Sequence, residues 1–128
     1  MSHSNYIRVT KPFIVEEGTK VSDLVRELKG RGIDIVLVVR KGTPIGWLST
    51  KNLDSPERLS CEVQEIMNRN IITVNGNEDL LDVLSLMIKN KLDCLLLMKR
   101  GKVEGVITVK DVLYAIQKNA ETVSSQTS

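Results

Sequence analysis

Two stretches of the chain place a hydroxyl side chain three positions before an acid or an amide, shortly after a glycine. They read Gly46-Trp-Leu-Ser49-Thr-Lys-Asn52 and Gly105-Val-Ile-Thr108-Val-Lys-Asp111. A hydroxyl in this position caps a helix, and the residue three places later can hydrogen-bond back to it. The N–H groups of a helix start attract an anion, and an ionised carboxylate there accepts strong hydrogen bonds. The pattern therefore predicts two helix starts that can also hold a polar ligand.

A lysine precedes the last residue of each stretch, as Lys51 and Lys110. A cation in the first turn of a helix opposes the helix dipole by about 0.3–1 kcal/mol. Its presence in both stretches suggests a ligand anion that compensates the charge. Two exposed, solvated lysines explain the pattern equally well.

Both stretches belong to a longer internal repeat. Residues 13–53 overlay residues 72–112 at a constant offset of 59 residues, without a gap. Two copies are too few for a solenoid, which needs about three or more to bury a core. We therefore expect two small units packed face to face with paired clefts between them, an arrangement typical of a binding module. The identical pairs are Val15 with Val74, Asp23 with Asp82, Asp34 with Asp93, Leu37 with Leu96, Gly42 with Gly101, Gly46 with Gly105 and Lys51 with Lys110.

Each copy shows the pattern of strand, helix, strand, strand and helix. The first helix is marked by apolar residues at helical spacing, and the next segment is an apolar run typical of a strand buried on both faces. The first copy predicts strands at 13–15, 33–40 and 45–48, a helix from Val21 to Leu28 and a second helix beginning at Ser49. The second copy predicts strands at 71–74, 94–98 and 103–107, a helix entered at Asn77 and a closing helix from Thr108 to about Lys118.

Composition limits the classes of function. The net charge is +2 and aromatic residues make up 3% of the 128 residues, so stacking on single-stranded nucleic acid is not expected. A local basic patch of Lys99, Arg100, Lys102 and Lys110 leaves open weak nucleic-acid binding, which steep salt dependence would reveal. Cys61 and Cys94 are read as reduced thiols. Neither a signal peptide nor a membrane span is apparent, and we expect a cytoplasmic protein.

Catalysis is not expected. His3 is the only histidine and lies near the start of the chain, so a catalytic triad and an imidazole metal site are ruled out. No phosphate-binding loop of the G-x-x-x-x-G-K-[ST] type occurs. We expect neither a catalytic cofactor nor a bound metal.

The repeat, the order of elements, the turn glycines and the two motifs in register together resemble a tandem pair of cystathionine-β-synthase (CBS) domains, also called a Bateman module. The resemblance covers about Lys11 to Ala115 and includes the short predicted helix Val63–Met67. It implies an α+β fold in which two βαββα repeats pack with pseudo-two-fold symmetry. The expected organisation is an arm at 1–10, the first repeat at 11–55, a linker with a lead-in helix at 56–70, the second repeat at 71–118 and a disordered tail at 119–128.

In this family the cleft between the repeats binds adenosine-containing ligands such as AMP, ADP, ATP or S-adenosylmethionine. The resemblance implies that each cleft combines the motif of one copy with the strand starts of the other. One site would comprise Val106, Thr108, Lys110 and Asp111 with Pro12, Phe13, Ile33 and Asp34. The second would comprise Trp47, Ser49, Lys51 and Asn52 with Ile71, Ile72, Leu92 and Asp93. The first is favoured because Asp111 carries a charge and Asn52 does not, and Trp47 either stacks on adenine or plugs the pocket.

The resemblance also raises two open questions. Family members often carry basic residues where this chain has Asp34 and Asp93. The two acids disfavour phosphate-rich ligands and favour a nucleoside-like or cationic ligand such as S-adenosylmethionine. Family members usually form homodimers through their helices and act on an effector protein, which the sequence does not identify. The alternative to a ligand sensor is a dimerisation or interaction domain that has lost ligand binding and docks a partner.

Overall fold

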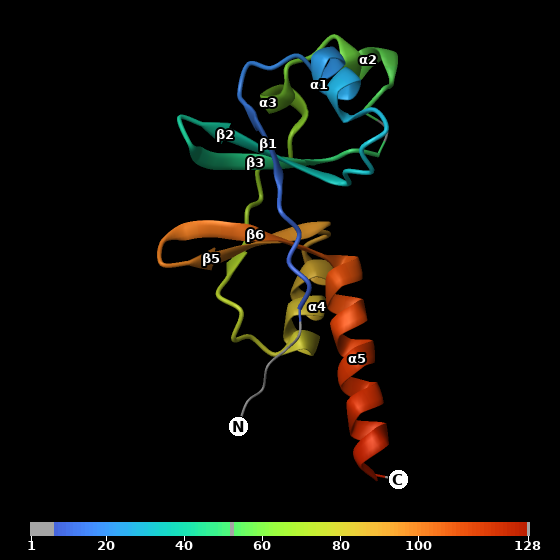
Figure 1. The fold of residues 1–128 in the computed structure, drawn as a ribbon. Helices are drawn as coiled ribbons and strands as arrows, with labels where there is room; N and C mark the ends of the chain where they lie inside the picture. The colour runs from blue at the N-terminus through green and yellow to red at the C-terminus, as the bar shows by residue number, and fades with distance from the viewer. Residues whose placement is uncertain (1–6, 52, 128) are drawn as a thin grey trace. The chain divides into compact units, whose positions relative to one another are not determined.

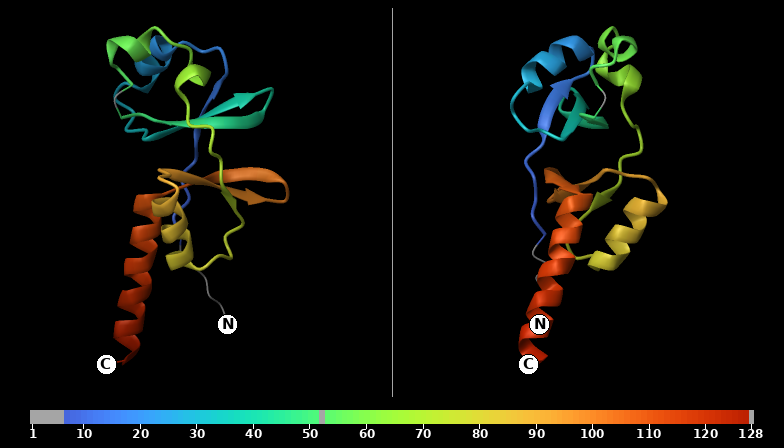
Figure 2. Two further views of the ribbon diagram at one scale, coloured as in Figure 1. Left: turned by 180° about the vertical axis from the view of Figure 1, so that it is seen from behind. Right: turned by 90° about the vertical axis from the view of Figure 1, so that its right-hand side faces the viewer.

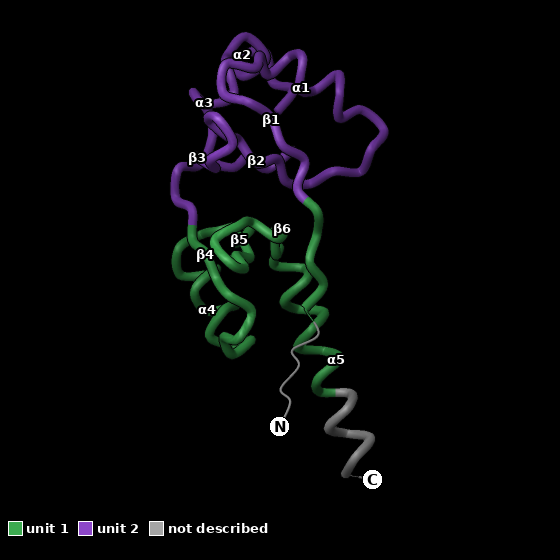
Figure 3. Tube along the Cα trace, turned by 60° about the vertical axis from the view of Figure 1, so that its left-hand side comes forward, with its two compact units in different colours: residues 1–11, 72–128 green, residues 12–71 purple. Residues whose placement is uncertain are grey.

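The computed structural model describes residues 7–51 and 53–127, with side chains up to residue 120. In each of two units, helices cover one face of a three-stranded sheet (Figure 1; Figure 2). Unit 1 comprises residues 1–11 and 72–128, and unit 2 comprises residues 12–71 (Figure 3). The start of the chain is therefore grouped with the second repeat and not with the first.

Unit 2 contains the first repeat and the lead-in helix. Its elements are β1 (Phe13–Glu16), α1 (Val21–Leu28), β2 (Ile35–Arg40), β3 (Thr43–Ser49), α2 (Pro56–Leu59) and α3 (Val63–Ile66). Central strand β2 pairs in parallel with β1 and antiparallel with β3. Its apolar run is buried on both faces, as the sequence predicts. Every second residue of β2 packs into a core with the helices, which comprises Val15, Val21, Leu24, Val36, Val38, Leu48, Leu53, Val63 and Met67.

Unit 1 contains the second repeat. Its elements are β4 (Thr73–Val74), α4 (Leu80–Lys89), β5 (Cys94–Lys99), β6 (Lys102–Thr108) and α5 (Val109–Thr127). Central strand β5 again pairs in parallel with β4 and antiparallel with β6. Within the described part of the chain, no helix has the length and apolar character needed to cross a membrane.

The β2–β3 and β5–β6 hairpins confirm the 59-residue repeat at the level of strand register. Ile35 lies opposite Ser49 in one hairpin, and Cys94 lies opposite Thr108 in the other. The register shifts at the same place, between residues 38 and 39 and between residues 97 and 98. Both tight turns have two successive residues with positive φ, the second of which is a glycine, as the twist of a two-residue hairpin requires. The predicted fold class, two βαββα units with mixed three-stranded sheets, is confirmed.

The helix predicted to begin at Ser49 does not form there. The chain continues through turns, and α2 begins only at Pro56. Residues before a proline are disfavoured in helical conformation, and Ser55 is extended with φ −66° and ψ 145°. In addition, Thr50 donates its backbone N–H to the carbonyl of Asp34 at 2.9 Å. No proline follows the motif of the second repeat, and α5 follows β6 directly.

Two other helix limits differ from those expected. Asp79 and not Asn77 caps α4, because its carboxylate accepts the N–H of Leu81 at 2.9 Å. The backbone of α5 is helical to Thr127, whereas a disordered tail was expected from residue 119.

In each unit a segment that precedes a repeat lies against the edge of a sheet. Thr10 and Val106 exchange two backbone hydrogen bonds, of 2.9 and 2.8 Å, and Asn68 and Trp47 exchange two of 2.8 and 3.0 Å. A glycine permits each close approach. A Cβ atom on Gly105 would lie 2.9 Å from the carbonyl oxygen of Thr10, and one on Gly46 would lie 2.9 Å from that of Asn68.

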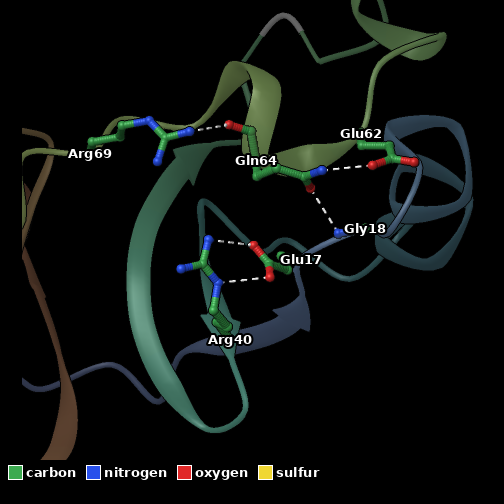
Figure 4. A network of polar contacts seen from close by, with 6 residues as sticks. All are labelled: Glu17, Gly18, Arg40, Glu62, Gln64 and Arg69. Carbon is green, nitrogen blue, oxygen red and sulfur yellow. Dashed lines mark hydrogen bonds and ion pairs between the residues drawn. The ribbon is translucent and has the colours of Figure 1, made fainter.

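Polar contacts fasten α3 to the β1–α1 loop of unit 2 (Figure 4). The side chain of Gln64 accepts the N–H of Gly18 at 2.7 Å, and Arg69 donates to the carbonyl of Gln64 at 3.2 Å. Beside them, Arg40 donates two parallel hydrogen bonds of 2.8 and 3.0 Å to the carboxylate of Glu17. This bidentate pair lowers the pKa of Glu17 below its ordinary value of 4.5, mainly through the hydrogen bond.

Substitution of Gly105 by alanine tests the packing of the N-terminal segment. The added methyl group overlaps backbone that cannot move independently of its two hydrogen bonds, so we expect a loss of about 1–3 kcal/mol in unfolding free energy. Urea denaturation measures the loss, with exposed Ser85→Ala in α4 as the control. A change within about 0.5 kcal/mol for Gly105→Ala would contradict this packing.

The Glu17–Arg40 pair makes stability depend on pH. Because the pKa of Glu17 is lowered in the folded state, the pair stabilises the protein above the unfolded-state pKa near 4.5, and the effect is lost as the pH falls through the folded-state pKa. We expect Glu17→Gln to lower the melting temperature at pH 7, by progressively less as the pH falls below 4.5, and by less at high salt. Glu16→Gln is the neighbouring control, and an equal effect of both substitutions at pH 7 would refute the assignment.

Candidate functional site

The end of β6 and the start of α5 form the polar corner of unit 1. The backbone N–H of Thr108 donates to Oδ2 of Asp111 at 2.9 Å, and the N–H of Asp111 donates to Oγ1 of Thr108 at 3.2 Å. These reciprocal bonds have the geometry of a capping box with an aspartate in place of the usual glutamate. Thr108 therefore caps its helix as the sequence predicts, and the cap fixes the carboxylate at the first turn.

Asp111 is the one charged side chain that is buried among the described residues, with 6% of its surface exposed. Its Oδ2 also accepts a hydrogen bond of 3.4 Å from Oγ1 of Thr10. No described residue donates to Oδ1. Oδ2, in contrast, has two donors. One carboxylate oxygen is thus held by the protein, and the other can accept a hydrogen bond from a ligand.

The remaining predicted residues of unit 1 differ in exposure. Val106 is fully buried in β6, and Leu92 is 3% exposed. Ile72 is half-buried, and its carbonyl accepts the N–H of Leu96 at 3.0 Å. Lys110 and Asp93 are exposed, and neither forms an ion pair with a described residue. Lys110 can therefore meet an anion near the start of α5 at no cost in broken contacts.

The thiol of Cys94, next to Asp93, is not a nucleophile at neutral pH. Burial of the side chain, and next the charge of Asp93, raise the pKa of Cys94 to about 12. The reactive thiolate form is then a negligible fraction at pH 7.

In unit 2 the end of β3 is tied to the segment that leads into β2. Oγ1 of Thr50 donates to the carbonyl of Ile33 at 2.9 Å, next to the backbone bond from Thr50 to Asp34. The hydroxyl of Ser49 accepts the N–H of Lys51 at 3.3 Å, so it stabilises a turn and does not cap a helix. Predicted residues from both expected sites therefore lie close together in this unit.

Arg31 was not among the predicted site residues. Its guanidinium lies 5.8 Å from the centre of the Phe13 ring, within the range of a cation–π interaction. The side chain is exposed. It adds a positive charge to the predicted site residues of unit 2, which include the acid Asp34. The only signal in the sequence is a cation between two glycines, which by itself marks a loop.

Trp47 is held by unit 2 itself. The side chain is 4% exposed, and its indole N–H donates to the carbonyl of Asn70 at 3.1 Å. Neighbouring Ile71 is half-buried. This geometry favours the packing role of Trp47 over stacking on a ligand.

Each predicted site draws residues from both units. For the first, Val106, Thr108, Lys110 and Asp111 belong to unit 1, and Pro12, Phe13, Ile33 and Asp34 belong to unit 2. For the second, Trp47, Ser49, Lys51 and Ile71 belong to unit 2, and Ile72, Leu92 and Asp93 belong to unit 1. Asn52 lies outside the described residues. The structure brings together the members within each unit, and their combination into two composite sites stays a prediction.

A metal site is not evident in the described ranges, where no three or more His, Cys, Asp or Glu side chains are grouped so as to hold an ion. The arrangement in unit 1, with a fixed carboxylate, a helix start and an exposed lysine, suits hydrogen bonding to hydroxyls and anions.

Comparison with protein families identifies both halves of the chain. The model of the CBS domain matches residues 6–54 and again residues 63–118. The two matches correspond to the two repeats and together cover most of the chain.

Individual proteins show the same relationship. A-adding tRNA nucleotidyltransferase from Aquifex aeolicus is 29% identical over 115 residues, which are 88% of this chain but only 14% of that enzyme. The crystal structure of a conserved protein from Pyrococcus horikoshii superposes with a TM-score of 0.73 at 24% identity, covering 91% of this chain and 95% of that one. The CBS domain structure of a bacterial CNNM/CorC family Mg²⁺ transporter, in complex with ATP, gives a TM-score of 0.72 at 21% identity, covering 88% of this chain and 84% of that one.

Proposed function

The chain belongs to the CBS domain family as a tandem pair of these domains, and from this premise we propose that it is a regulatory module that binds an adenosine-containing ligand. The observation that carries the proposal is the carboxylate of Asp111, which is buried, fixed by a capping box and without a described donor at Oδ1. A carboxylate in this position can accept hydrogen bonds from both hydroxyls of a ribose. Burial strengthens these bonds, since water competes less with the ligand.

In each unit, positive groups lie near the predicted ligand-binding residues, and these groups suit a phosphate or another anion. The backbone N–H groups at the start of α5 carry the positive end of a helix dipole. Exposed Lys110 lies in the same turn, and Arg31 lies beside Phe13 in unit 2. The positive charge of Arg31 favours a phosphate group, whereas the negative charge of Asp34 alone would repel it.

The choice among adenosine ligands depends on these opposing charges. A structural neighbour of this chain is described as a complex with ATP, which supports a nucleotide. The carboxylates of Asp34 and Asp93 favour a ligand with less negative charge, such as S-adenosylmethionine or AMP. The proposed class is therefore adenosine-containing ligands, from which a binding panel selects the member.

We propose further that the module is not an enzyme. The unreactive thiol of Cys94 supports this view, as does the match to the Aquifex enzyme over only 14% of that enzyme's length. In the proposed mechanism the ligand stabilises one arrangement of the two repeats, and the effector protein responds to that arrangement.

A thermal-shift panel with AMP, ADP, ATP and S-adenosylmethionine tests the proposal. A ligand at 100 times its dissociation constant adds about 2.7 kcal/mol to the unfolding free energy, which raises the melting temperature by several degrees. We expect such a shift for the wild type with at least one ligand, and its loss in Asp111→Ala.

The matched position in the first repeat provides the control. Because Asn52 lacks a charge, Asn52→Ala should retain the shift if the site of Asp111 is the main one. Only ligand-induced shifts are compared, since the loss of the cap also lowers the stability of Asp111→Ala by about 1 kcal/mol. The absence of a shift with all four ligands in the wild type would refute the sensor.

A second candidate function, self-association, is favoured by the helices of unit 1. Leu81 and Ile88 on α4 are 65% and 67% exposed, and Leu113 on α5 is 49% exposed. A hollow of about 230 Å³ between α4 and α5 is lined by Asp79, Leu80, Leu81, Ile116 and Asn119. The positions in the first repeat that match Leu81 and Ile88 hold Ser22 and Lys29. Among the described residues, large apolar side chains exposed on a helix occur in the second repeat only, and we propose that a homodimer forms through this surface.

Exchanging the residues at these matched positions tests the dimer. The double substitution Leu81→Ser with Ile88→Lys gives α4 the residues of α1 and should convert a dimer into a monomer in sedimentation analysis. Ser22→Ala with Lys29→Ala alters the matched positions of α1 and should leave the mass unchanged. A wild-type monomer at about 100 μM, or a dimer that survives the first pair of substitutions, would refute this interface.

A further inference from the structure

The segment at residues 8–10 is built into unit 1 next to the carboxylate of Asp111. The paired backbone bonds between Thr10 and Val106 attach it to the edge of β6, and the missing side chain of Gly105 lets it lie close to the strand. The guanidinium of Arg8 stacks 4.5 Å from the ring centre of Tyr114 on α5. Strand and helix thus both hold the segment, so the position of the Thr10 hydroxyl is determined.

The hydroxyl of Thr10 shares one carboxylate oxygen with the helix cap. Oδ2 of Asp111 accepts the N–H of Thr108 at 2.9 Å and the hydroxyl of Thr10 at 3.4 Å. Two donors from different directions fix the rotation of the carboxylate more firmly than the cap alone. With Oδ2 occupied, Oδ1 is the oxygen that remains for a ligand.

The equivalent residue of unit 2 behaves differently. Asn68 pairs with the backbone of Trp47 as Thr10 pairs with that of Val106. Its side-chain oxygen, however, accepts the N–H of Asn70 at 2.8 Å, so the side chain serves its own backbone. In unit 1, therefore, the structure shows a side chain of the lead-in segment that donates to the carboxylate of the motif.

From this arrangement we propose that Thr10 is a positioning residue of the ligand site, whose hydroxyl aligns the Asp111 carboxylate to receive the ribose hydroxyls. The inference rests on the proposed function and adds to it a side chain from the segment that precedes β1. It makes ligand affinity depend on a correctly docked N-terminal segment. Thr10 itself need not touch the ligand.

The test compares Thr10→Val, which keeps the shape and removes the hydroxyl, with Thr10→Ser, which keeps the hydroxyl. Isothermal titration is carried out on the full chain with ATP and AMP and with their 2′,3′-dideoxy counterparts. Thr10→Val should weaken binding of the ribonucleotides roughly three- to tenfold, the range expected for one hydrogen bond, whereas Thr10→Ser stays within about twofold of the wild type. The dideoxy compounds, which lack the groups that Asp111 would bind, should show no difference between wild type and Thr10→Val.

Each alternative gives a distinct result. If Thr10→Val weakens both kinds of nucleotide equally, the residue acts only through the fold, and the positioning role is refuted. If Asp111→Ala abolishes binding and Thr10→Val does not weaken it, the proposed function stands and this inference fails. If neither ATP nor AMP binds to the wild type, this inference falls, whereas the sensor still stands on S-adenosylmethionine and ADP.

A measurement without ligand checks the contact itself. In a double-mutant cycle of Thr10→Val and Asp111→Asn, followed by urea denaturation, the effects on stability should not be additive. Additive effects would show that the hydroxyl does not hold the carboxylate, and would overturn the inference even if nucleotides bind.

Discussion

The backbone pairing between a lead-in segment and an edge strand is the constraint on which the rest of this structure depends. Each repeat supplies a sheet of only three strands, and the outer edge of β3 or β6 would otherwise expose unpaired N–H and C=O groups. Thr10 and Asn68 each donate one backbone hydrogen bond to these edges and accept one from them, and so cover part of each edge. The contact requires glycine at 46 and 105, which explains why each motif begins with that residue.

The same pairing determines the chemistry of the polar corner in unit 1. A carboxylate that is 6% exposed is costly unless donors surround it. The cap of α5 supplies one donor, and the segment on β6 supplies the other. Structural and proposed functional roles are therefore combined in Asp111, since both bonds that make its burial tolerable go to Oδ2 and leave Oδ1 without a described donor. In unit 2 the end of β3 differs, because Thr50 bonds to the segment before β2 and the next helix begins only at Pro56.

The parts of this architecture that the sequence predicts are those determined by local pattern. Strand order, hairpin register and the cap at Thr108 follow from apolar runs, turn residues and hydroxyl spacing within about 45 residues. The first repeat departs from the prediction at Ser49, where Thr50 bonds to the segment before β2 and no helix begins until Pro56. The part played by Thr10 could not be predicted, since the segment pairs through its backbone with a strand nearly a chain length away. The segment also departs by one residue from the 59-residue offset, because the residue that pairs with the strand is Thr10 in one unit and Asn68, and not Arg69, in the other.

The division of the chain into a continuous unit and an interrupted one has a consequence for the order of folding. Residues 12–71 form unit 2 as one continuous stretch, so its whole sequence has been synthesised before β5 and β6 of the second repeat. Unit 1 includes the pairing of Thr10 with Val106 on β6, so it can close only after β6 has been synthesised. Closing so long a loop is costly for an unfolded chain. When residues 12–71 fold first, the flexible part of this loop is shorter, and closing it costs less entropy.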